Sequence, residues 1–302
     1  MSRRTSIKEP SVSGQPASSR LVCETFTESD IEGAHTLSLQ FRWPHRSDDW
    51  RFAAAAGHGF VVREGATVVG TALCWPWGEQ GATLGLVIVS ADQQGRGIGR
   101  MLMERLLEAL GTRMTVLHAT EAGQPLYEKL GFRKIGLLHQ HQGDSFTAPL
   151  VEPPPGERLR PLEPGDTPRL VELASRASGL ERSALVPPLL DVSQGVALVR
   201  GDAVLGFALL RPFGRGHAIG PVAVAADDGL PMQRAKALIA NRLAANAGAF
   251  TRLDTPDEQG LGPWLESIGL ARVDTVVKMA RNGEPAHDPG VLQFAIVNQA
   301  LG

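Results

Sequence analysis

The two halves of this 302-residue chain repeat one another, and this internal repeat restricts the possible folds more than any other feature. The segment FVVREGATVVGTALCWPWG, residues 60–78, matches VALVRGDAVLGFALLRPFG, residues 196–214. Further along, GLVIVSAD recurs as GPVAVAAD, and PLYEKLGF recurs as PWLESIGL. The three matches follow one order at an offset of about 135 to 138 residues. We therefore interpret the chain as a duplication of one fold rather than as two unrelated α/β domains.

Each half has the same predicted order of elements: a helical segment, a hairpin, and then strand, helix, strand and helix. Residues 60–78 and 196–214 are each two β-rich runs joined by a short polar turn, which predicts a hairpin. Apolar residues at helical spacing from Gly97 to Leu110 predict an amphipathic helix between two apolar strands. This order indicates an α/β (α+β) fold, with a mixed sheet and flanking helices in each half.

Composition suggests where the domains begin and end. Residues 1–20 are rich in Ser, Pro and Arg, so we expect a disordered arm there. The segment VEPPPGE at 151–157 predicts a stiff linker. We therefore expect one domain at 21–150, a second at 158–282, and a tail at 283–302 that begins as a loop and then turns apolar.

Charge and cysteine content exclude several classes of function. Thirty Lys and Arg against 32 Asp and Glu leave a formal net charge of -2, which gives no electrostatic footprint for nucleic acid or an anionic membrane. No apolar run approaches the ~18 residues of a membrane helix, and the basic start lacks the apolar core of a secretory signal. Cys23 and Cys74 suit a reducing compartment. We expect a cytoplasmic monomer or homodimer without nucleic-acid or membrane partners.

The strongest local signal is the glycine-rich segment IVSADQQGRGIGRML, residues 88–102, where an apolar strand gives way to the amphipathic helix. Its glycines let the backbone approach an anion closely, and the free N–H groups of the first helical turn favour negative charge. Arg96 and Arg100 add donors for phosphate. There is no Walker A lysine, and the GxGxG spacing disfavours a dinucleotide turn. The turn is either a pyrophosphate cradle or a glycine-rich helix start that binds nothing.

The Gln-x-x-Gly-x-Gly turn, followed by a strand and AGQPLYEKLGF, resembles the GCN5-related N-acetyltransferases (GNAT) over residues 21–148. The resemblance implies two tandem GNAT-like domains, each a mixed, mostly antiparallel sheet flanked by helices. It also implies acetyl-CoA as co-substrate, with the pyrophosphate on the turn and the pantetheine arm along the preceding strand. The residues that it assigns to acetyl-CoA are Val87, Ile88, Val89, Gln94, Gly95, Arg96, Gly97, Ile98, Gly99, Arg100, Thr120 and Tyr127.

Tyr127 is the only tyrosine in the chain. The resemblance implies that it protonates the departing CoA thiolate, which a phenol with a pKa near ~10 can do. The alternative is an aromatic ring that packs at the base of a helix. Thr120 stands where the family commonly has Asn, and Gly123 where it usually has Ala, so individual pantetheine contacts differ here.

The acceptor site is less sharply defined by the sequence. Many family members carry a Glu on the strand before the cradle, but TLGLVIV has no carboxylate. The resemblance places residues 40–50, QFRWPHRSDDW, at the border of the acceptor site, and His45 is a candidate base because its ordinary pKa lies near ~6.5. Alternatively, Ser47 or Asp48 in this segment only caps the next helix. The candidate substrate-binding residues are Trp43, His45, Arg46, Trp75, Glu79 and His139.

Histidine and tryptophan pairs nearby leave two alternatives open. His139 and His141 would share one face of a strand, but with only His118 in addition they offer too few ligands, so we expect no metal. One of them could line the acceptor pocket or satisfy the strand edge. Trp75 and Trp77 could wall that pocket or pack in the core.

The second half has lost the features that point to acetyl-CoA. Its cradle position reads ADDGLPMQRAKAL, residues 226–238, with one glycine, a proline without an N–H and two aspartates of the wrong charge. Leu265 stands at the tyrosine position. We expect a degenerate GNAT-like domain that does not bind acetyl-CoA in the usual manner. The predicted function is direct acetyl transfer from acetyl-CoA to the primary amine of a small molecule. The alternatives are a non-catalytic acyl-CoA-binding sensor and an acyltransferase that acts on a protein or peptide amine.

Overall fold

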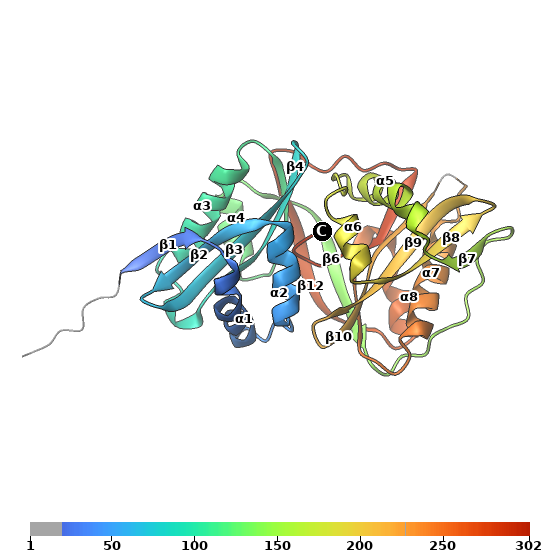
Figure 1. Cartoon of the computed structure of the whole chain (residues 1–302), viewed down its shortest axis with the longest axis horizontal. Helices are drawn as coiled ribbons and strands as arrows, with labels where there is room; N and C mark the ends of the chain where they lie inside the picture. The colour runs from blue at the N-terminus through green and yellow to red at the C-terminus, as the bar shows by residue number, and fades with distance from the viewer. Residues whose placement is uncertain (1–19, 227) are drawn as a thin grey trace, which may run out of the picture.

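The structure is a computed structural model that describes residues 20–226 and 228–302. The expected disordered arm therefore falls almost entirely outside the described residues, and so does Asp227. Figure 1 shows two lobes side by side, each a twisted sheet with helices on it, joined by long strands at the centre. No helix in the described part is long and apolar enough to cross a membrane.

The first lobe contains the predicted hairpin and the predicted amphipathic helix. Its elements are β1 (Leu21–Thr25), η1 (Glu28–Asp30), α1 (Ile31–Gln40), α2 (Ser47–Ala56), β2 (His58–Glu64), β3 (Thr67–Trp77), β4 (Gly81–Val89), η2 (Ala91–Gln93), α3 (Ile98–Leu110), β5 (Met114–Ala119), α4 (Gln124–Lys129) and β6 (Arg133–Gly143). The hairpin of β2 and β3 turns at Gly65, whose φ of 62° suits glycine. Apolar residues of α3 pack on one face of the sheet, and α1 and α2 cover the other with Trp50 and Trp75.

The second lobe repeats the α-helices and strands of the first in the same order and adds one strand. Its elements are β7 (Arg158–Pro161), η3 (Pro164–Asp166), α5 (Thr167–Ser178), α6 (Val186–Asp191), β8 (Gln194–Arg200), β9 (Ala203–Phe213), β10 (Gly216–Ala225), α7 (Pro231–Ala245), β11 (Thr251–Pro256), η4 (Asp257–Gln259), α8 (Gly262–Ser267), β12 (Ala271–Arg281) and β13 (Val291–Ala295). Among the strands that the structure describes, only the pairs β4–β5 and β10–β11 are parallel. The prediction of mixed, mostly antiparallel sheets with flanking helices is confirmed.

The two halves exchange their last repeated strands, β6 and β12, which the sequence did not predict. One sheet runs through both lobes in the order β1-β2-β3-β4-β5-β12-β6-β11-β10-β9-β8-β7, with β13 on β10. The repeat counterpart of β6 in the second half, β12, pairs with β5, while β6 itself pairs with β11. These two long strands also pair with each other at the centre of Figure 1, with Leu138 opposite Val276. Each half therefore completes its sheet with a strand from the other.

A V-shaped gap in the first lobe positions the candidate site. The strands β4 and β5 pair only from Gly81–Thr83 to Met114–Val116 and then diverge. Beyond that point the edge of β4 forms no pair with β5, and Leu86 has a φ of 53°. The glycine-rich turn lies at the open end of this gap, between β4 and α3.

Candidate functional site

An open slot occupies the gap between β4 and β5, with a cavity volume of about 390 Å³. Its walls come from the edges of both strands, from α4, and from the end of α1. The predicted acetyl-CoA residues that line it are Val87, Ile88, Val89, Gln94, Gly99, Thr120 and Tyr127. Gly95, Arg96, Gly97, Ile98 and Arg100 lie beside them in the turn and the first turn of α3. The structure thus brings the predicted residues together around one slot and its mouth.

The turn presents free backbone donors. Gly95 and Gly97 have φ values of 79° and 81°, a region that side chains with a Cβ disfavour. A Cβ added at either position would meet nothing within 4 Å, so the backbone conformation rather than crowding requires glycine. The first helical bond of α3 runs from the N–H of Met101 to the carbonyl of Gly97. The N–H groups from Ile98 to Arg100 therefore precede the helical ladder and can bind an anion.

The two arginines of the turn make surface ion pairs. A guanidinium nitrogen of Arg96 lies 3.0 Å from Glu64, and Nε of Arg100 lies 2.7 Å from Glu104. Exposed pairs of this kind contribute only about 0.2–1 kcal/mol. Both side chains can therefore exchange these carboxylates for a phosphate at small cost.

Tyr127 lies on α4 with its ring against the slot. The side chain is only 8% exposed, and its ring packs edge-on against Phe132 at 6.1 Å between centroids. Burial raises the pKa of the phenol to about 12, so the hydroxyl stays protonated at neutral pH. The arrangement leaves a proton donor beside the slot.

Of the segment expected to border the acceptor site, Trp43 lines the slot and His45 does not. The His45 ring lies among Trp43, Trp50 and Phe213, with centroids 5.7–6.2 Å away. Burial and the charge of nearby arginines lower its pKa to about 4, and its Nδ1 has no partner among the described residues. The role of His45 as base stays a prediction. The enclosed position of its ring, outside the slot, does not favour that role.

Residues 46–49 cap α2 in a way that differs from the sequence expectation. Neither Ser47 nor Asp48 is the cap; instead the carboxylate of Asp49 accepts the backbone N–H of Arg46 at 2.9 Å. The Arg46 guanidinium bonds the same carboxylate, also at 2.9 Å. The Arg46 side chain is thus engaged in the start of the helix rather than in the slot.

The other candidate acceptor residues lie away from the slot. Trp75 is fully buried and donates to the Ala53 carbonyl, so it packs in the core. Glu79 is exposed in the turn between β3 and β4, at the opposite end of β4 from the cradle. His139 lies on the exchanged strand β6, which pairs with β11 of the second lobe, and its ring forms hydrogen bonds with Asp257 and Thr275. No group of three or more possible ligands in the described ranges could hold a metal ion.

The structure places further residues at or beside the slot, which the sequence did not assign to it. Lys278 on β12 lies opposite His118 on β5, and His118 lines the slot. The Nδ1 atom of His118 lies 2.8 Å from the carbonyl oxygen of Gln299. Strand alternation could have found His118, because it lies two residues before Thr120 on the same face. No sequence signal pointed to Gln299.

Two separate comparisons match the two halves to one family. A family described as acetyltransferase (GNAT) domain matches residues 55–134, and a second one with the same description matches residues 170–295. The chain belongs to the GNAT acetyltransferases. It is an acyltransferase of a family that generally uses acetyl-CoA and acts on amines, and it carries a GNAT domain in each half.

The comparisons also match most of the length of this GNAT protein to several relatives and solved structures. It is 28% identical over 224 residues to the uncharacterized N-acetyltransferase YitH of Bacillus subtilis, over 73% of this chain and 76% of the relative. A proposed acetyltransferase of Pyrococcus horikoshii shares its fold with a TM-score of 0.77 at 17% identity, over 96% and 98% of the two chains. A tandem GNAT protein from the clavulanic acid biosynthesis pathway gives a TM-score of 0.59 at 17% identity, over 88% and 100%.

The second GNAT domain has the same gap, but its own chain fills it. The strands β10 and β11 pair at His217 and Ala218 and then diverge, as β4 and β5 do. The additional strand β13 pairs along Val222–Ala225 of β10, the repeat equivalent of Val87–Ser90. On the other side, the N–H of Ile296 donates to the Asp254 carbonyl of β11 at 3.0 Å. An extended peptide thus occupies the second gap.

Carboxylates of the protein occupy the cradle position of the second domain. Arg234 near the start of α7 is 1% exposed and bonds Glu157, at 2.6 Å, and Asp228. Arg200 bonds the same two carboxylates, each at 2.7 Å. Glu157 and Asp228 therefore supply the negative charges that a pyrophosphate would bring to this position.

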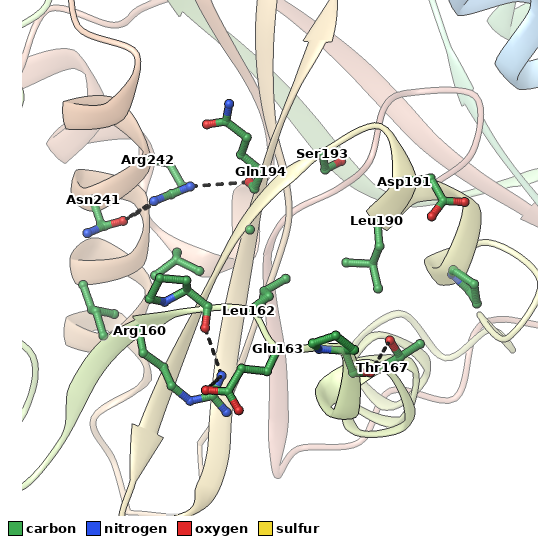
Figure 2. A pocket seen from close by; sticks show the side chains of 16 residues that line it. Arg160, Leu162, Glu163, Thr167, Leu190, Asp191, Ser193, Gln194, Asn241 and Arg242 are labelled. Carbon is green, nitrogen blue, oxygen red and sulfur yellow. Dashed lines mark hydrogen bonds and ion pairs between the residues drawn. The ribbon is translucent and has the colours of Figure 1, made fainter.

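A separate hollow in the second domain has a counterpart at the equivalent place in the first domain. Figure 2 shows side chains that line this cavity, beside α5, α6 and β8. Its volume is about 790 Å³. Its arginines are engaged within the protein, Arg160 with Asp166 and Arg242 with Asn241. The first domain has a hollow of about 310 Å³ at the equivalent place. Neither hollow shares a lining residue with the slot beside Tyr127.

Proposed function

We propose that the protein transfers the acetyl group of acetyl-CoA directly to the primary amine of a small molecule, and that the slot of the first domain is the site of this reaction. The observation that carries the proposal is the contrast between the two gaps. The gap beside Tyr127 is open, whereas β13 fills the gap of the second domain. We also propose the domain limits 21–150 and 158–282 along the chain, with 151–157 as linker and 283–302 as a tail whose strand β13 pairs with the second domain.

The residues around the first gap fit acetyl-CoA. In the second domain, the equivalent edge of β10 accepts an extended peptide, which supports pairing of the pantetheine amides with Val87–Val89 of β4. The free N–H groups after Gly97 receive the pyrophosphate, and Arg96 and Arg100 add charge. Thr120 offers a hydroxyl to a pantetheine amide from the side of β5.

Tyr127 supplies the proton that the leaving group needs. The amine nitrogen attacks the thioester carbonyl carbon, the C–S bond breaks, and the sulfur takes the phenolic proton. A backbone N–H near Val89 at the edge of β4 polarises the carbonyl oxygen as negative charge develops on it.

The surroundings of the slot favour a small acceptor. Phe41 and Trp43 flank it on the side of α1. Ala300 crosses over β4, so close that a Cβ added to Gly85 would lie 3.0 Å from its Cα. These groups leave a narrow approach, which suits a small amine better than a folded protein surface.

A thiol-release assay with a panel of small primary amines tests the proposal. We expect turnover with at least one amine, and a loss of about 10²-fold or more in kcat for Tyr127→Phe. The affinity for CoA should be unchanged in this variant, because the phenol contributes to proton transfer rather than to binding. CoA binding without turnover of any amine would contradict an enzymatic role and favour a sensor, whereas turnover of peptide amines alone would contradict the small acceptor.

A further inference from the structure

The residues that line the slot leave one candidate for the base that accepts the proton of the attacking amine. Among the described residues that line it there is no Asp, Glu, Lys or Cys. His118 is the one lining side chain with a nitrogen lone pair that can take up a proton. Its strand, β5, forms the wall opposite β4, where the thioester is expected.

The contact with Gln299 fixes the tautomer of His118. A carbonyl oxygen can only accept a hydrogen bond, so Nδ1 of His118, 2.8 Å from it, carries the proton. The other ring nitrogen, Nε2, then has a free lone pair. The backbone of the C-terminal segment thereby orients the ring and leaves its acceptor nitrogen unprotonated.

The charges that face His118 keep it neutral. Burial is the main cause that lowers its pKa to about 4, the bond to Gln299 opposes this, and Lys278 and Arg182 lower it further. Lys278 comes from β12, the exchanged strand, and Arg182 from the segment between α5 and α6. The same two cations disfavour an ammonium ion nearby, so they favour the neutral amine that can attack.

We propose that His118 is a catalytic residue, whose Nε2 accepts the proton of the attacking amine. This inference rests on the proposed function. As the C–N bond forms, one proton passes from the amine nitrogen to Nε2. As the C–S bond breaks, the sulfur takes the proton of Tyr127. Solvent then removes the proton from His118 and restores the one on Tyr127, so the products are the amide and CoA thiol.

Two substitutions separate this role from a structural one. His118→Asn keeps an N–H at the place of Nδ1 and so preserves the bond to Gln299, but it has no atom at the place of Nε2. His118→Gln reaches the place of Nε2 but loses the donor to Gln299. We expect both to lower kcat by about 10²–10⁴-fold, because neither amide can take a proton. The Kd for CoA should stay within about threefold of wild type in His118→Asn.

The pH dependence gives a readout that a structural role would not change. Wild-type kcat should level off once the acceptor amine is neutral, whereas kcat of His118→Asn should keep rising with pH as hydroxide replaces the base. A His118→Asn enzyme with wild-type kcat and the same plateau overturns the inference and leaves the proposed function intact. Wild-type protein that turns over no amine overturns both.

Discussion

His118 and Gln299 meet through a hydrogen bond of 2.8 Å although 181 positions separate them in the sequence. The chain reaches this point by leaving the filled gap of the second domain after β13 and passing over β4 of the first. The side chain of Asn298 fixes the turn there, because its Oδ1 accepts the N–H groups of Ala300 and Leu301 at 2.9 and 2.8 Å. The C-terminal segment thus contacts a residue that lines the slot of the first domain.

We expect Asn298→Ala to weaken catalysis without preventing folding. Two backbone N–H groups lose their acceptor, which costs about 1 kcal/mol for each bond that water does not replace. The Gln299 carbonyl is then less firmly held against His118, so kcat should fall while the Kd for CoA stays the same. Asn298→Asp keeps the accepting oxygen and is the matched control. Equal kcat values for the two variants would contradict the link.

A second prediction concerns the conformation of the glycine-rich turn. Gly97→Ala places a Cβ at φ 81°, which costs roughly 1–2 kcal/mol and distorts the free N–H groups after it. CoA affinity measured by calorimetry should fall about tenfold or more. Gly111→Ala, at φ 63° and ψ -128° on the other end of α3, is the control, because it also places a Cβ at a positive φ but lies away from the glycine-rich turn. It should lose stability but bind CoA as wild type does.

The local elements of this protein could be predicted from its sequence, but the exchange of β6 and β12 could not. The conformation of the turn at Gly97 and of the amphipathic helix after it is determined by residues that are close in the sequence. The strand β5 can satisfy the same hydrogen bonds with β6 or with its repeat copy β12, so sequence spacing does not decide between them. For this reason the sequence predicts His139 at the acceptor site, whereas the structure pairs it with β11 of the second domain. Lys278 of β12 lies opposite β5 instead.

The strand exchange predicts that the halves stay together after the linker is cut. Leu150, just before the linker, is 91% exposed, so a protease site introduced there should be cleaved in the native protein. Both fragments should then elute together in size-exclusion chromatography, because β6 remains paired with β11 and β12. Separation into two folded monomers without denaturant would contradict the observed pairing. An uncut sample of the same variant controls for the insertion.

The filled gap of the second domain predicts the stoichiometry of binding. Since β13 pairs along Val222–Ala225 and Arg234 is already bonded to carboxylates, only the first gap can accept CoA. Calorimetric titration of the full chain should give one CoA per chain. The Gly97→Ala variant should weaken this single binding event and reveal no second one. A second site of comparable affinity would show that β13 can be displaced.

The last prediction uses the buried ring of His45 to separate stability from catalysis. Its pKa of about 4 in the folded protein lies below the ~6.5 of an unfolded chain, so between these values the unfolded state binds more protons. The stabilisation from its neutral form is complete above about pH 6.5 and is lost as pH falls toward 4.

His45→Phe keeps an aromatic ring among Trp43, Trp50 and Phe213, so its Tm should match wild type at pH 8 and fall less on acidification. Its kcat should remain near wild type, because His45 does not line the slot. An unchanged pH slope of Tm would contradict the buried neutral ring, whereas a large loss of kcat in the folded variant would assign the base to His45 instead of His118.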